Sequence, residues 1–147
     1  MLKFLNMNDQ SLKKKVQVVV IANAELLLFE FNSQIANNYV GFQNITGGVE
    51  GEESFYEAAV RELVEEAGIT ASVIDLNLEF TFHDRWKKNC LERVYLCHLN
   101  QKPEIVLNEE HLHCKWVALN KVTESDYTFP NNYKAFLSAK KFIEGLK

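Results

Sequence analysis

Five of the six glycines in this chain lie in one window of 28 residues, from Gly41 to Gly68. Glycine reaches backbone conformations that other residues avoid, so such a cluster marks a segment with special backbone geometry. Within the window, Ser54 to Ala67 contains neither glycine nor proline, and Ser54 stands three residues before Glu57, the spacing of a capping box. The window therefore predicts a loop of unusual backbone that leads into a helix ended by Gly68.

Segments rich in β-branched and aromatic residues flank this window on both sides. Val16–Ile21 and Leu26–Phe29 are separated by a short turn and predict a hairpin. Ser72–His83 and Cys90–Leu99 predict a second, longer hairpin. The other expected elements are a strand over Phe42–Thr46, a strand over Leu112–Leu119, and an amphipathic closing helix over Asn131–Leu146 with Phe136 and Leu137 among its apolar residues.

The composition is that of one soluble globular domain, since 47% of the 147 residues are apolar and 24% are charged. The longest strongly apolar run, Val16–Ala22, is far shorter than the roughly 20 residues of a membrane-spanning helix, and we expect neither membrane insertion nor export. A net charge of −4 and a single short basic run, Lys13–Lys15, argue against a nucleic-acid partner.

The cysteines are three in number, Cys90, Cys97 and Cys114, and form no close CxxC pair. This pattern favours reduced thiols in a cytoplasm over a disulfide framework or a zinc site. We therefore expect a cytoplasmic protein whose cysteines fill the core.

The predicted helix places one arginine and three glutamates close together, namely Arg61, Glu62, Glu65 and Glu66. At 3.6 residues per turn, Glu65 and Glu66 lie on the same face as Glu62. Like charges at these spacings destabilise a helix by roughly a few tenths of a kcal/mol per pair, and a divalent cation is the natural compensation. Ligands that are all oxygen favour Mg²⁺ or Mn²⁺. The alternative is a solvated acidic face, which is common on surface helices.

The spacing of these residues matches a known motif. From Gly47 to Ile69 the sequence follows G-x5-E-x7-R-E-U-x-E-E-x-G-U, where U is aliphatic, at every defined position. The chain therefore resembles the Nudix hydrolases, whose Nudix box has this pattern. The resemblance implies an α/β fold, the Nudix-type α/β/α sandwich with a mixed sheet and a catalytic loop-helix, in a single Nudix hydrolase domain over residues 1–147.

Two further segments, Phe42–Glu50 and Glu110–Val117, are similar to segments of bacterial dihydroneopterin triphosphate diphosphatases. Both segments are shared, more loosely, with other Nudix hydrolases of nucleotides and nucleotide sugars. They therefore support the fold more than they support a particular substrate.

The resemblance assigns metal-binding roles within the box. Glu62, Glu65, Glu66 and the backbone carbonyl of Gly47 would hold Mg²⁺, for which Mn²⁺ would substitute. Glu53 would add a further carboxylate to the site.

Arg61 would fix these carboxylates by ion pairing; its alternative role is an ordinary i,i+4 pair with Glu57. From the residues alone, we expect Gly47 and Gly48 to form a turn in which a backbone carbonyl approaches the cation without a side chain in the way.

Many Nudix enzymes recruit one more carboxylate from a late loop, as a metal ligand or general base. Glu110 is the best candidate here, because it begins the second matched segment just before an expected strand. Glu109 is the fallback, and the alternative for both is an exposed acidic loop.

Residues near the tip of the long hairpin are candidates for substrate binding. Phe82 and Trp86 would stack on a base or pterin ring, with core packing as their alternative. Arg85 and Arg93 would bind phosphate or ribose groups, with ordinary solvation as theirs. The histidines lack metal-ligand spacing with cysteine, and we assign them no catalytic role.

The resemblance implies hydrolysis of the pyrophosphate linkage of a small nucleoside diphosphate derivative: dihydroneopterin triphosphate, a nucleotide sugar, a dinucleoside polyphosphate or a nucleoside triphosphate. The alternative is a Nudix-fold sensor that binds a nucleotide metabolite without chemistry. Such sensors commonly have a degraded box, whereas every box carboxylate is present here. The resemblance also implies a homodimer.

Overall fold

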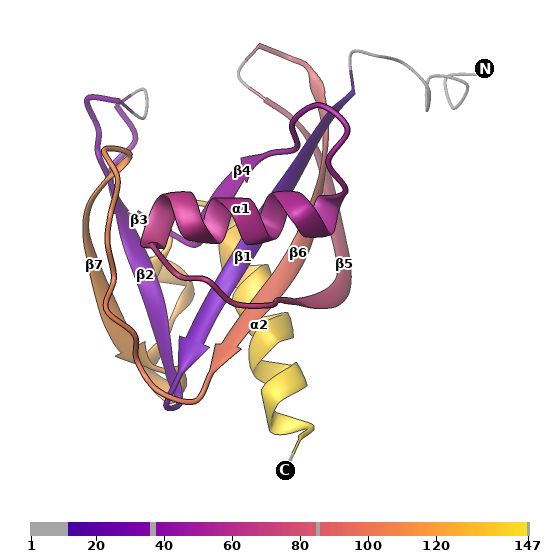
Figure 1. The fold of residues 1–147 in the computed structure, drawn as a ribbon. Coiled ribbons are helices and arrows are strands. Elements are labelled where there is room, and N and C mark those ends of the chain that lie inside the picture. The colour runs from indigo at the N-terminus through magenta and orange to yellow at the C-terminus, as the bar shows by residue number, and fades with distance from the viewer. Residues whose placement is uncertain (1–11, 36–37, 85, 147) are drawn as a thin grey trace.

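The computed structural model describes residues 12–35, 38–84 and 86–146, which form a mixed sheet between two helices (Figure 1). The seven-stranded sheet has the order β3-β2-β1-β6-β5, with β4 paired to β1 and β7 paired to β2. β1 and β6 run parallel and the other pairs are antiparallel. The strands are β1 (Lys13–Ala22), β2 (Glu25–Phe31), β3 (Phe42–Gln43), β4 (Ile45–Gly48), β5 (Ile74–His83), β6 (Asn89–Leu99) and β7 (His111–Ala118).

Both predicted hairpins are confirmed. β1 and β2 are joined by Asn23 and Ala24, which have φ of 52° and 61°. Two positive φ values in a two-residue loop match the right-handed twist of the flanking strands, which is the geometry that such hairpins prefer. β5 and β6 form the longer antiparallel pair, and a bulge between Asp75 and Leu78 interrupts their register.

The single strand expected over Phe42–Thr46 is instead two short strands, β3 and β4, separated at Asn44. The backbone N–H of Asn44 donates to the side chain of Asn132, 2.7 Å away, rather than to a neighbouring strand. The sheet partner changes at this point, because β3 pairs with β2 and β4 pairs with β1.

The two α-helices, α1 (Phe55–Ala67) and α2 (Pro130–Glu144), cover opposite faces of the sheet (Figure 1). α1 packs on a core that includes Val18, Phe29 and Tyr95, and α2 packs on a separate core of the other face. This arrangement confirms the α/β/α sandwich. None of the helices in the described part of the chain is long and apolar enough to span a bilayer.

The apolar face of α2 was only partly predictable. Phe136 is buried as expected, but Leu137 is 43% exposed, and the small residues Ala135 and Ala139 occupy the interface instead. The buried residues Asn132, Ala135, Phe136 and Ala139 share one face of α2, and Leu137 lies about 100° from Phe136 around the helix axis, outside that face. Among the cysteines, Cys90 and Cys97 are buried, Cys114 is half-buried, and all are free.

Candidate functional site

α1 begins and ends at the residues that the sequence indicates. The Ser54 hydroxyl accepts a hydrogen bond from the backbone N–H of Glu57, and the Glu57 carboxylate accepts one from the backbone N–H of Ser54. Gly68 caps the other end with φ of 69°, in the left-handed region. Because Glu57 is occupied by the capping box, it is not the partner of Arg61.

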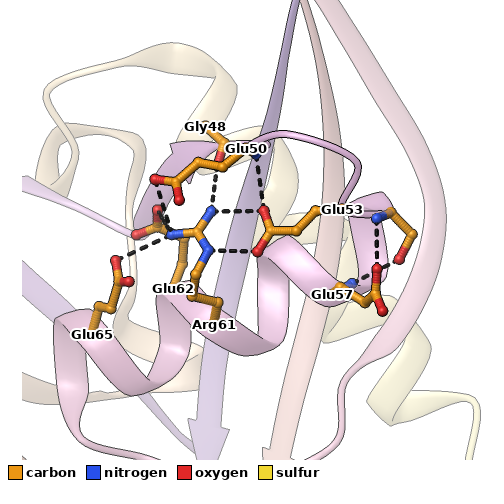
Figure 2. Close-up of polar contacts among 8 residues, drawn as sticks. Gly48, Glu50, Glu53, Glu57, Arg61, Glu62 and Glu65 are labelled. Carbon is orange, nitrogen blue, oxygen red and sulfur yellow. Dashed lines mark hydrogen bonds and ion pairs between the residues drawn. The ribbon is translucent and has the colours of Figure 1, made fainter.

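Arg61 lies at the centre of the acidic residues of α1 and the preceding loop (Figure 2). Its guanidinium forms a two-pronged contact with Glu53, with Nε 2.6 Å from Oε2 and Nη2 3.0 Å from Oε1. Nη1 donates to Glu62 at 3.0 Å and to Glu65 at 3.1 Å, and Nη2 donates to the carbonyl of Gly48 at 2.6 Å. One guanidinium thus ties the loop, the end of β4 and two turns of α1 together, which favours the orienting role over a simple helix pair.

Gly47 and Gly48 lie in β4 and not in the turn that we expected. The reason for glycine at position 47 is a close approach: a Cβ there would lie 2.0 Å from the carboxyl carbon of Glu62. A glycine turn does exist in the loop, but at Gly51, whose φ is 55°. Glycine at position 47 therefore admits the Glu62 carboxyl against the strand backbone, and any larger residue would displace that carboxyl.

The carboxyl groups around Arg61 differ in acidity. Hydrogen bonds from Arg61 and from the backbone N–H of Glu50 hold the pKa of Glu53 below its ordinary value. Burial raises the pKa of Glu62 to about 7, and the charges of Glu66 and Glu65 act in the same direction while Arg61 opposes them. Glu62 is therefore the carboxyl of this group that gains most from a second cation.

Glu66, one turn along α1, has different partners. It is 2% exposed, and its Oε1 lies 3.1 Å from Nδ1 of His111, the first residue of β7. Neither of these two buried atoms makes an aligned hydrogen bond. The other oxygen, Oε2, accepts a hydrogen bond from Asn108 at 3.2 Å, and Gln43 Nε2 lies 2.8 Å from Nε2 of His111.

Glu110 is brought next to Glu66 by the loop before β7. Burial raises the pKa of Glu110 to about 7, and the negative charge of Glu66 adds to this effect. Asn108 fixes the loop, since its side chain accepts from the backbone N–H of Glu110 at 2.9 Å. Glu109 and Glu110 are both exposed residues, but the carboxyl of Glu110 is partly desolvated and interacts with Glu66. Of the two candidates, the fold thus brings Glu110 to the α1 carboxylates.

His111 is the residue of this site that the sequence reasoning missed. It has no metal-ligand spacing in the sequence, yet its ring is buried against Glu66 and lies 5.2 Å, between ring centroids, from Phe29. The available signal was its place directly after Glu110 in the matched segment. A side chain that contacts a candidate metal ligand, but does not bind the metal itself, produces no metal-ligand spacing in the sequence.

The chemistry of this donor set fits a divalent cation. The groups are carboxylates and backbone carbonyls, the hard oxygen ligands that Mg²⁺ and Mn²⁺ prefer, and Glu66 Oε1 is a buried oxygen without an aligned hydrogen bond. Within residues 12–35, 38–84 and 86–146, no three acidic, histidine or cysteine side chains already converge on one point. Arg61 stands between Glu62 and Glu65 instead.

The candidate substrate-binding residues lie on two faces of the sheet. Phe82 is opposite Cys90 and shares a face with the residues that contact α2, whereas Arg93 is opposite Glu79 and lies on the α1 face. Arg93 forms an ion pair with Glu79, and its guanidinium carbon is 4.3 Å from the ring centroid of Phe55. Register thus separates Phe82 from Arg93.

Two candidates belong to the loop between β5 and β6. Trp86 is 62% exposed, and Lys13 Nζ lies 5.0 Å from its ring centroid. The same lysine forms a 2.8 Å ion pair with Asp84 and so links the start of β1 to this loop. Arg85 lies outside the described residues.

Comparison with protein-family models matches residues 12–139 to the NUDIX domain. The chain is 31% identical over 120 residues to the dihydroneopterin triphosphate diphosphatase of Haemophilus influenzae, which covers 72% of this chain and 73% of that protein.

Solved structures with a similar fold include the dihydroneopterin triphosphate pyrophosphohydrolase of E. coli, with a TM-score of 0.73, 23% identity, and coverage of 84% of this chain and 91% of that one. An Ap4A hydrolase of C. elegans has a TM-score of 0.75 at 20% identity, over 90% of this chain and 98% of that one. At these identities the likeness shows a shared fold.

Proposed function

The chain belongs to the NUDIX domain family and is a Nudix hydrolase, and on that premise we propose that it cleaves the pyrophosphate linkage of a nucleoside diphosphate derivative with the help of Mg²⁺ or Mn²⁺. The observation that carries the proposal is the meeting of Glu110 with Glu66 of α1 across the fold. This meeting adds a carboxyl of raised pKa to the acidic face of α1.

In this proposal Glu62, Glu65 and Glu66 hold the cation, with Glu110 and the Gly47 carbonyl as further oxygens. The bound cation would neutralise charge on the phosphate oxygens and orient a water for attack on phosphorus. Arg61 and Glu53 are positioning residues: their two-pronged contact joins α1 to the loop before it, and the hydrogen bond from Arg61 to the Gly48 carbonyl joins α1 to β4.

Glu110 is the proposed general base. With a pKa near 7, its carboxylate oxygen is well matched to accept the proton of the attacking water at neutral pH, because general bases work best when their pKa lies near the working pH. Its nearness to Glu66, a proposed ligand, would place it beside a water held by the cation.

Dihydroneopterin triphosphate is the first substrate to test, because the Haemophilus influenzae relative named for that activity is 31% identical over most of both chains. Nucleotide sugars, dinucleoside polyphosphates and nucleoside triphosphates complete the panel. Phe82 and Trp86 are proposed to contact the ring of the substrate, and Arg85 and Arg93 its phosphate or ribose groups.

The test is a phosphate-release screen of purified protein against this panel with Mg²⁺, with and without a coupled phosphatase. We expect turnover of at least one compound, and its loss in the matched Glu62→Gln variant, which keeps the shape of the side chain and removes its charge. Survival of every compound at high enzyme concentration would contradict the proposed substrate class and favour the sensor alternative.

We also propose a cytoplasmic location, which the three free thiols support. A homodimer and a single domain over residues 1–147 are proposed from the family resemblance.

A further inference from the structure

A chain of buried polar side chains lies on the α2 face of the sheet, away from the acidic residues of α1. Gln17 Nε2 donates to Glu92 Oε1 at 2.9 Å, and Asn44 Nδ2 donates to Gln17 Oε1 at 2.7 Å. The hydroxyl of Tyr127 donates to Asn44 Oδ1 at 2.7 Å. Gln17 and Asn44 are fully buried, and Glu92 is 4% exposed.

Glu92 is the one acid in this chain of contacts, and it is incompletely satisfied. Its second oxygen, Oε2, accepts no hydrogen bond from the described residues. This oxygen keeps some contact with solvent. Burial raises the pKa of Glu92 above its ordinary value. Burial of a carboxyl lowers the free energy of unfolding relative to an apolar or amide side chain at the same position. Its burial therefore suggests a functional role for Glu92.

Aromatic side chains border Glu92 on the same face. Phe80 is directly opposite Glu92 in the β5–β6 pair, and Phe82 is opposite Cys90. Since side chains two residues apart in a strand share a face, Phe80, Phe82 and Glu92 point to one side of the sheet. Both phenylalanines are half-buried. The carboxyl thus offers a polar edge next to aromatic surface, the combination that a flat heterocycle requires.

Lys15 connects this face to the catalytic end of the sheet. It lies opposite Glu92 of β6 on one side and opposite Gly48 of β4 on the other. A Cβ at Gly48 would meet nothing within 4 Å, and a cavity of about 340 Å³ is lined by Lys15 and Gly48 among other residues. The same cavity is lined by Glu53, which binds Arg61 beside the carboxylates of α1. Lys15 therefore lies between Glu92 and the loop that carries Glu53.

We propose that Glu92, held by Gln17, determines which substrate ring is accepted, by accepting hydrogen bonds from adjacent N–H and NH₂ groups of the ring edge. That pair of donors belongs to the 2-amino-4-oxopyrimidine edge shared by guanine and pterins. Adenine presents an acceptor in place of the ring N–H, which would face a carboxylate oxygen that can only accept. The inference rests on the proposed function, since it names the substrate class of the same active site.

The first test measures binding without catalysis. Guanosine, 6-hydroxymethylpterin and adenosine are titrated into metal-free protein, and binding is followed by NMR shifts of ¹⁵N-labelled backbone amides. We expect guanosine or the pterin to bind at least about tenfold more tightly than adenosine, because a hydrogen bond to a charged group contributes enough for such a ratio. Equal affinities, or no binding of any ring, would overturn the proposal whether or not the protein hydrolyses phosphates.

The second test is a kinetic comparison of Glu92→Gln with Asp75→Asn, a control that removes a carboxylate from the opposite, exposed face of β5. For GTP and dihydroneopterin triphosphate, Glu92→Gln should raise KM by about tenfold or more and leave kcat within about twofold, while KM for ATP stays unchanged. A purely structural role would instead change all substrates alike, and that outcome contradicts the proposal.

The two tests also show whether the preferred ring is guanine or a pterin. A second variant keeps the proposal testable if the first variant does not fold. A preference for GTP points to guanine nucleotides, and a preference for the pterin triphosphate points to pterins. If Glu92→Gln does not fold, Glu92→Asp, which withdraws the carboxyl by one methylene, must show the same ring-selective loss for the proposal to stand.

Discussion

Two groups of polar residues surround the acidic residues of α1, one around Glu62 and the other, one helical turn along, around Glu66. The protein balances the negative charge of the two groups in different ways. In the Arg61 group (Arg61, Glu53, Glu62 and Glu65), one guanidinium contacts every carboxylate at 2.6–3.1 Å. In the Glu66 group (Glu66, Asn108, Glu110 and His111), Glu66 accepts a hydrogen bond from the side-chain amide of Asn108. The imidazole of His111 lies 3.1 Å from its other oxygen but makes no aligned hydrogen bond with it.

The difference separates charge that the chain neutralises itself from charge that is left for an added cation. Charge that the chain already neutralises with its own arginine holds a loop, a strand and a helix in a fixed arrangement. Charge that lacks an aligned partner inside a buried site is where an added cation contributes most, because the interaction is screened least there. We therefore expect an added cation to change the charge balance of the Glu66 group most, and the loss of Glu65 to change the stability of the metal-free protein least.

The largest expected effect comes from removal of the metal. EDTA should abolish turnover, and Mg²⁺ or Mn²⁺ should restore it, because every proposed ligand is a hard oxygen. Cation binding to the folded state alone should also raise the melting temperature, since saturation to one hundred times Kd adds about 2.7 kcal/mol. Full turnover in metal-free buffer would contradict the proposed role of both groups.

Glu110→Gln tests the role of general base that we propose for Glu110 in the Glu66 group. We expect kcat to fall by about 10²-fold or more, because general acid–base groups typically contribute 10² to 10⁴. Glu109→Gln is the matched control, since Glu109 is exposed in the same loop and its side chain makes no hydrogen bond within the described residues. Equal and mild effects at both positions would make Glu110 an ordinary loop residue.

His111→Asn tests whether the imidazole positions Glu66. Residues that orient a metal ligand typically contribute about 10- to 100-fold in metal affinity or activity. We expect the Mg²⁺ concentration for half-maximal activity to rise by about tenfold, with a smaller change in maximal turnover. His113→Asn, two residues along β7 and exposed, should leave that concentration unchanged. A loss of turnover that excess Mg²⁺ does not relieve would argue against a positioning role.

Glu62 provides a test through the pH dependence of stability. Its pKa is about 7 in the folded protein, above the ordinary value of 4.5, so between these values the folded state retains a proton that the unfolded state has released. The corresponding stability is fully present below pH 4.5 and is lost as pH rises toward 7 and above. The melting temperature in EDTA should therefore fall over this window, and Glu62→Gln should reduce the fall.

Glu65→Gln is the control for that measurement and the smallest expected effect. Glu65 is half-exposed and pairs with Arg61 at i,i+4, a class of contact worth roughly 0.3–0.5 kcal/mol. In EDTA we expect unfolding free energy close to that of the parent and an unchanged fall in melting temperature with pH. A large destabilisation would show that the Arg61 group depends on Glu65 as well as Glu53.

Some features of this site follow from residues that are close together in the sequence. The capping box at Ser54 and the left-handed cap at Gly68 both predicted the bounds of α1, because each involves contacts within a few residues. The placement of Arg61 among the box carboxylates was likewise readable from helical periodicity. For the same reason, the short turn at Asn23 and Ala24 predicted the first hairpin.

Other features depended on which distant elements meet. The contact of Glu66 with His111, the collision that a Cβ at Gly47 would make with Glu62, and the partner change at Asn44 join residues from different elements. Phe82 and Arg93 belong to one predicted hairpin, yet the register turned them to opposite faces. The sequence by itself determined the local elements and the chemistry that they carry, because capping, periodicity and turn geometry act between near neighbours. Only the tertiary structure decided which carboxyl is buried, paired or left without an aligned partner, because strand register and helix packing set those distances.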